Sequence, residues 1–223
     1  MAGCRIGGFR MTDSTKHSVP PLDAEVRLLA AITYGEASTK DNAEEMFAMA
    51  SVLIRQRDAR GYKSVSSFAA KEKTFAYAAI DGNQRFKKMM KASEWEIAHQ
   101  AGLKAAVAAA VNAMSGGEDK SNGAYFWDGA DIKTNYAHHF KVRKGIKFTD
   151  PSHNIYDIKE STNVVIISKT TKIRNQSTGK TFTSTEEVGR FDHQYDSTAA
   201  HGGTIFWKLN PEFLKVTRGW EYK

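Results

Sequence analysis

The chain reads LDAEVRLLAAITYGEA over residues 22–37, and this stretch decides the expected fold. Its inward-facing positions recur every three or four residues, which is the pattern of a helix buried along one side. They are Leu22, Val26, Leu29 and Thr33 or Ala30. We predict a helix over residues 22–33 and a short connection over residues 35–40. Glu36 therefore follows Gly35 directly after a buried helix.

A second helix is predicted after this connection. Asp41-Asn42-Ala43-Glu44 places an Asx residue three positions before a Glu, which is typical of a capping box with Asp41 as the cap. That helix is expected to end near Gly61. A short helix is predicted over residues 65–70 and a long alanine-rich one over residues 93–115, while residues 74–80 fit either a strand or a loop.

The composition changes in the second half of the chain. Short runs rich in β-branched or aromatic residues occur at 163–171, 179–185 and 204–207. We find no internal repeat and no linker between separable domains. The sequence therefore predicts an α+β fold: one domain over residues 20–223, mainly helical, with a β-rich insertion or appendage at about 160–208. Residues 1–19 are expected to form a flexible leader.

Charge and composition limit the function classes. The 223 residues carry 32 Lys and Arg against 25 Asp and Glu, a formal charge of +7, which favours polyanionic partners such as a bacterial cell wall. The one cysteine, Cys4, has no internal partner for a disulfide. No apolar run is long enough for a membrane span, and the first residues lack the apolar segment of a secretory signal. We therefore expect synthesis in the cytoplasm without a signal peptide.

Glu36 is the strongest candidate for chemistry. A carboxyl group at the end of a buried helix, beside the ring of Tyr34, would be partly removed from water, and this raises its pKa. Such a group stays protonated near neutral pH and can act as a general acid. The alternative is a glutamate that faces solvent in a turn between helices.

Several motifs of this chain resemble a known family. Residues 31–37 read AITYGEA and residues 49–54 read MASVLI. Counterparts follow in the same order: Thr74-Phe75, the alanine helix at 105–114, GAYFW at 123–127 and, more weakly, GTIFW at 203–207. In these motifs the chain resembles the SleB-like cell wall hydrolases, the spore-cortex-lytic family, over residues 22–128. It departs from the family pattern at residues 38–41, at Arg55-Gln56 and at Thr74.

The resemblance implies a lysozyme-like fold that cleaves the β-1,4 bond between N-acetylmuramic acid and N-acetylglucosamine, with Glu36 as the catalytic residue and no cofactor. It also favours a lytic transglycosylase, in which one carboxyl group acts first as acid and then as base. A hydrolase would need a second carboxylate. Asp128 and Asp41 are the candidates, although Asp41 also fits a helix cap and Asp128 a turn.

Aromatic and hydroxyl side chains near these motifs are candidates for sugar binding, because the apolar faces of pyranose rings stack on aromatic rings. They are Tyr34, Thr74, Phe75, Tyr77, Tyr125 and Trp127. Ordinary core packing is the alternative for the aromatic residues.

Two other functions stay open from the sequence. A zinc peptidase of peptidoglycan could draw ligands from the histidines and nearby aspartates, but no HExxH spacing is present, so no metal site is predicted. The candidates are His138, His139, His153, His193, His201, Asp150 and Asp192. A noncatalytic binder of cell wall or nucleic acid would instead use basic clusters such as residues 85–88 and 141–147.

The leading prediction is a muramidase whose partner is the peptidoglycan glycan strand, with no nucleic acid involved. An enzyme of this kind without a signal peptide must reach the wall by another route. An antibacterial effector toxin, with a cognate immunity protein and a secretion-system component as partners, and a phage lysin are the two settings we expect.

Overall fold

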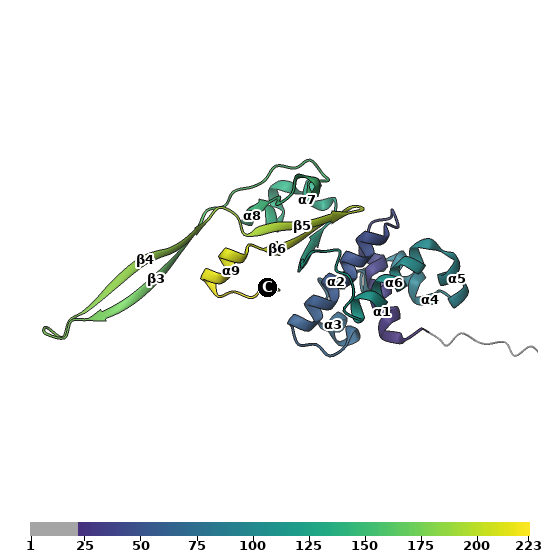
Figure 1. The fold of residues 1–223 in the computed structure, drawn as a ribbon, viewed down its shortest axis with the longest axis horizontal. Coiled ribbons are helices and arrows are strands. Elements are labelled where there is room, and N and C mark those ends of the chain that lie inside the picture. Colours follow the sequence, from purple (N-terminus) through teal and green to yellow (C-terminus); the bar gives the residue numbers. More distant parts are fainter. Residues whose placement is uncertain (1–21) are drawn as a thin grey trace, which may run out of the picture.

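A computed structural model describes residues 22–223, so the predicted leader over residues 1–19 lies outside the described residues. The fold is α+β, as predicted. Figure 1 shows a cluster of helices, a small sheet with further short helices beside it, and a long hairpin that points away from both. Among residues 22–223, every helix is too short or too polar to cross a bilayer.

The helical part is built around three alanine-rich helices. α1 (Ala24–Glu36) and α2 (Ala43–Ala59) both pack against α6 (Ala101–Met114). Small side chains at the contacts let the helix backbones approach closely, and the larger core residues fill the spaces between them. The fully buried alanines of these three helices are Ala30, Ala31, Ala48, Ala50, Ala106, Ala109 and Ala110.

Two boundaries near the start of the chain differ from the prediction. α1 continues through Gly35 to Glu36, so the connection is shorter than residues 35–40. The cap of α2 is Asn42, whose Oδ1 accepts from the backbone N–H of Glu45 at 2.9 Å. Asp41 has a left-handed backbone with φ of 51° and lies outside the helix, so the cap is one residue later than predicted and the reciprocal glutamate bond of a capping box is not formed at this helix.

The predicted long helix over 93–115 is in fact two helices. α5 (Glu94–His99) begins with a capping box between Ser93 and Glu96, and Gln100 is extended (φ −110°, ψ 116°) before α6 starts. α3 (Val65–Lys71) confirms the short helix predicted there, and residues 74–80 contain the 3-10 turn η1 (Tyr77–Ala79). The prediction missed α4 (Gln84–Lys91) and α9 (Pro211–Thr217).

The second half forms a four-stranded sheet in the order β1-β6-β5-β2. Antiparallel pairs join β1 (Phe126–Asp128) to β6 (Thr204–Leu209), and β6 to β5 (Tyr195–His201). β2 (Ile146–Lys147) runs parallel to β5. Four short helical segments, α7 (Asp131–Thr134), η2 (Tyr136–His138), α8 (Phe140–Lys144) and η3 (Pro151–His153), lie between β1 and the hairpin in the chain and close a second core around Trp207.

The hairpin consists of β3 (Val165–Arg174) and β4 (Thr181–Phe191), which confirms the strands predicted at 163–171 and 179–185. Most of its side chains are exposed on both faces, and Figure 1 shows it projecting from the sheet. Ile173 and Phe182 form an apolar cross-strand pair near its tip. The hairpin therefore adds little to the two cores.

One buried carboxyl group joins the helices to the sheet. Glu45 is 0% exposed and accepts four hydrogen bonds. Two come from the backbone and hydroxyl of Ser38, after α1, at 3.1 and 2.6 Å. The other two come from the Gly203 N–H at 3.3 Å and the Thr204 hydroxyl at 2.6 Å, in the turn between β5 and β6. A side chain at Gly202 would collide with this carboxyl group, since its Cβ would lie 2.2 Å from Oε2.

We expect Glu45→Ala to lower the free energy of unfolding by about 3 kcal/mol, because its buried donors lose their acceptor. Glu44→Ala is the matched control: it changes the neighbouring glutamate, which is exposed, and should cost less than about 0.5 kcal/mol. Urea denaturation of both variants measures the difference. Equal losses would contradict the role assigned to Glu45.

Candidate active site

Glu36, the last residue of α1, is half-buried against the 3-10 turn η1. The backbone N–H of Ala78 donates to Glu36 Oε1 at 2.7 Å. This close approach depends on Gly35, because a Cβ there would lie 2.6 Å from the Ala78 side chain. The Gly-Glu sequence at the end of α1 therefore lets the turn pack against the helix and hold the carboxyl group.

Burial raises the pKa of Glu36 from an ordinary value of 4.5 to about 7. The nearby charge of Asp81 acts in the same direction, while the backbone N–H groups of Ala78 and Tyr77 oppose it by stabilising the ionised form. Glu36 is consequently close to half protonated at neutral pH. It can give a proton and take one back without a large change in pH.

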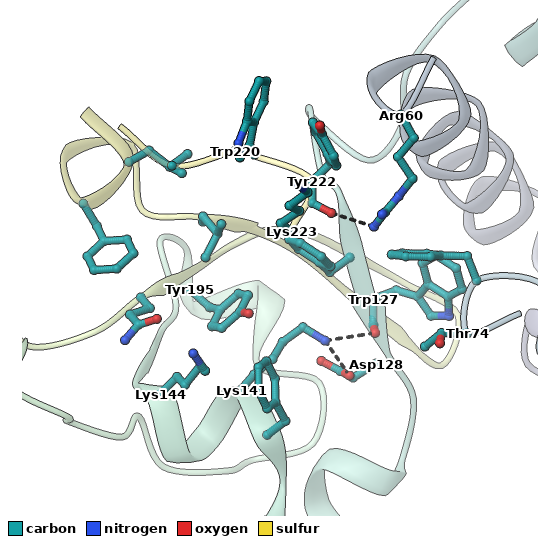
Figure 2. Close-up of a pocket in the computed structure, with 18 of the residues that line it drawn as sticks. Arg60, Thr74, Trp127, Asp128, Lys141, Lys144, Tyr195, Trp220, Tyr222 and Lys223 are labelled. Carbon is teal, nitrogen blue, oxygen red and sulfur yellow. Dashed lines mark hydrogen bonds and ion pairs between the residues drawn. The ribbon is translucent and has the colours of Figure 1, made fainter. Parts of the chain in front are cut away.

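Glu36 lines a groove of about 770 Å³ between the helices and the sheet. This volume falls in the range of roughly 300–1,000 Å³ that is usual for ligand sites. Thr74, Phe75, Trp127 and Asp128 line the same groove. Figure 2 shows Thr74 and Trp127 together at one side of it. The structure thus brings these five residues, all identified from the sequence, to one surface.

Aromatic rings form a continuous wall in this groove. Phe75 contacts Trp127 edge to face with ring centroids 5.7 Å apart, and Phe126 lies 6.4 Å from Phe75. Phe126 in turn meets Tyr195 edge to face at 5.8 Å. Phe75, Phe126 and Trp127 are each only partly buried, which leaves apolar surface for a ligand.

Asp128 is buried and pairs with two cationic side chains. Lys141 Nζ lies 2.8 Å and His139 Nε2 3.2 Å from its Oδ1, and His139 also lies 3.5 Å from Asp131 Oδ2. Hydrogen bonds to Asp128 and then to Asp131 raise the pKa of His139 to about 9. His139 is therefore protonated at neutral pH, and the two acidic groups face two positive charges.

Within residues 22–223, Asp128, Asp131 and His139 are the one group of three placed to share a metal ion. A metal there would have to replace both the His139 proton and the Lys141 contact. Two other histidines of the zinc alternative make separate contacts: His153 with Ser197 at 2.8 Å, and His193 with Asp196 at 2.9 Å. These residues therefore form ion pairs and hydrogen bonds with their neighbours.

Tyr34 and Asp41 lie outside the groove, around Arg85. The Arg85 guanidinium stacks on the Tyr34 ring at 3.7 Å, donates to the Tyr34 carbonyl at 2.7 Å and pairs with Asp41 at 2.8 Å. Tyr34 is buried by this arrangement. Both residues fix the end of α1 and do not face a ligand in the groove.

Tyr77 and Tyr125 also lie outside the groove. Tyr77 is 56% exposed in the turn beside Glu36. Tyr125 donates from its hydroxyl to Glu221 at 2.8 Å and carries Arg55 over its ring. Lys144, from the basic cluster at 141–147, lines the groove, and so do Arg60, Tyr195 and residues from the segment 218–223, which the sequence did not indicate. Of the last three, Arg60 alone had a sequence signal that could have indicated it, because it lies close to the predicted end of the second helix.

Comparison with protein-family models, with curated proteins and with solved structures gives no match for this chain.

Because the pKa of Glu36 is raised, we expect the free energy of unfolding to depend on pH. Between pH 4.5 and about 7 the folded state binds the Glu36 proton more tightly than the unfolded state does, so its contribution to stability falls as pH rises through this window. Glu36→Gln removes this dependence. From pH 4 to pH 8, the free energy of unfolding of the variant should rise by up to about 3 kcal/mol relative to that of the parent.

Urea denaturation of the parent and Glu36→Gln across this pH range measures the change, and other titrating groups cancel in the difference. A difference between the two proteins that stays constant with pH would contradict the burial of an ionisable Glu36.

Proposed function

We propose that this chain is a muramidase that cleaves the β-1,4 bond between N-acetylmuramic acid and N-acetylglucosamine, with Glu36 as general acid and base. The observation that carries the proposal is the half-buried Glu36, with a pKa of about 7, in an aromatic-lined groove. Glycosidic cleavage requires a carboxylic acid that stays protonated near the leaving oxygen. The resemblance of residues 31–37 to the SleB-like hydrolases supports the same role.

The proposed reaction is a lytic transglycosylation. Protonated Glu36 gives its proton to the glycosidic oxygen as the bond from muramic C1 to that oxygen breaks. The ionised carboxyl group then takes the proton of the muramic 6-hydroxyl as its oxygen bonds to C1. The products are a free 4-hydroxyl and a 1,6-anhydromuramic end, no water is consumed, and Glu36 regains its proton.

The other carboxyl groups on the groove support this reaction over hydrolysis. Asp128 is paired with Lys141 and His139. Glu72 accepts from the Tyr62 hydroxyl at 2.8 Å and lies 3.5 Å from Arg60. Both carboxylates are therefore already engaged with donors and cations, whereas a hydrolase needs one that binds and orients the attacking water. Among the described groove residues, Glu36 has no such cationic partner.

Glu36→Gln should lower turnover of purified peptidoglycan at least about a hundredfold, because it removes the proton that the leaving oxygen requires. The fold should be kept. Glu44→Gln, on the exposed side of α2, is the matched control and should retain activity. Mass spectrometry of the soluble products should show 1,6-anhydro-muropeptides.

Other products would reject the proposal in defined ways. Muropeptides with reducing ends would show that the reaction is hydrolysis and not transglycosylation. Released peptides without glycan cleavage would exclude a muramidase altogether. Full activity of Glu36→Gln would show that Glu36 is not the general acid.

A further inference from the structure

The segment over residues 218–223 forms part of the groove although it lies far from Glu36 in the chain. It begins where α9 ends, at Arg218, whose backbone is left-handed with φ of 52°. Gly219, Trp220, Tyr222 and Lys223 line the groove. Figure 2 shows Trp220, Tyr222 and Lys223 on one side of it, Lys141 and Lys144 on the other, and Tyr195 between.

Side-chain contacts fix this segment to the helical part. Arg60, at the end of α2, donates to the Tyr222 carbonyl at 2.8 Å and lies over both the Tyr222 and Phe75 rings at 5.2 Å. Glu221 accepts from the Tyr125 hydroxyl at 2.8 Å. Two separate anchors therefore hold residues 221 and 222 and set the position of their neighbours.

Trp220 is placed differently from its neighbours. The residue is 61% exposed although it lies in an anchored segment and lines a groove. Its ring contacts within the segment are with Tyr222, at 5.7 Å between centroids, and with the Lys223 ammonium at 5.6 Å. A large aromatic ring left open on a groove wall is typical of a surface that stacks against a ligand.

The four cationic side chains that line the groove differ in their ion pairs. Arg60 pairs with Glu72, and Lys141 with Asp128. Lys144 and Lys223 have no such ion pair with Asp or Glu within residues 22–223; their ammonium groups lie 5.0 Å from the Phe140 ring and 5.6 Å from the Trp220 ring. Lys144 and Lys223, on opposite sides of the groove, therefore provide positive charge that suits acidic groups on a ligand.

We propose that residues 218–223 and Lys144 form a glycan subsite, in which Trp220 stacks on a sugar while Lys144 and Lys223 bind carboxylates of the peptide attached to muramic acid. The assignment rests on the proposed function only for the identity of the glycan. It predicts that the groove prefers peptide-bearing glycan strands over an uncharged sugar polymer.

Binding to proteins that carry Glu36→Gln tests this subsite without turnover. The two probes are a hexamer of N-acetylglucosamine and soluble, uncrosslinked peptide-bearing glycan strands, titrated by calorimetry. Trp220→Ala should weaken binding of both probes about fivefold or more. The double variant Lys144→Ala with Lys223→Ala should weaken only the peptide-bearing strands, and added salt should reduce that difference.

Trp95→Ala is the matched control, because Trp95 is 68% exposed on α5 and does not line the groove. It should bind both probes as the parent does. Trp220→Phe keeps a ring and should recover part of the loss, which separates stacking from a general disturbance of the segment. Circular dichroism and thermal unfolding of each variant would check that it is folded.

The outcomes separate this subsite from the proposed function. If the parent cleaves peptidoglycan but Trp220→Ala binds both probes as Trp95→Ala does, the subsite is wrong and the muramidase stands. If the parent cleaves nothing but binds glycan through Trp220, the muramidase is wrong and the subsite stands. Equal loss of both probes in the lysine double variant would overturn carboxylate recognition.

Discussion

The hydrogen bonds to the buried carboxyl group of Glu45 connect the two halves of this molecule. One pair fixes Ser38, two residues after Glu36, and the other fixes the turn between β5 and β6. β6 pairs with β1, which carries Trp127 and Asp128. Glu36 and the strand that carries Trp127 are thus positioned through the same buried group. A local loss of these bonds would change the width of the groove as well as the stability of the fold.

The position of Glu36 also depends on a very close contact between backbone segments. Gly35 allows the η1 turn to approach α1, and the Ala78 N–H then meets the carboxyl group. Burial alone would favour the neutral acid, and the N–H groups of the turn favour the ionised one. The balance between these opposing effects keeps the pKa near 7. In the proposed reaction Glu36 would act both protonated and ionised, which requires a pKa close to the working pH.

Local patterns in the sequence predicted much of the helical part and the position of the acid. The spacing of buried residues before Gly35 indicated α1, and β-branched runs indicated β3 and β4. Choosing between Asp41 and Asn42 as the cap was beyond local pattern, because Arg85, distant in the chain, pairs with Asp41. Residues 218–223 have no periodicity at all. Their place in the groove comes from Arg60 and Tyr125, through contacts that only the folded chain brings together.

A ligand in the groove would alter the acid that it meets. Filling the space beside Glu36 removes water from a carboxyl group that is only half-buried, and this favours the neutral, protonated form. The N–H of Ala78 already donates to Glu36, because Gly35 lets the turn approach, so the ionised form would keep one strong donor during the proposed reaction. Substrate binding would therefore prepare the acid for the first proton transfer, while the turn preserves its capacity for the second. In the proposed reaction, the ligand in the groove would favour the protonated form and the turn would favour the ionised form.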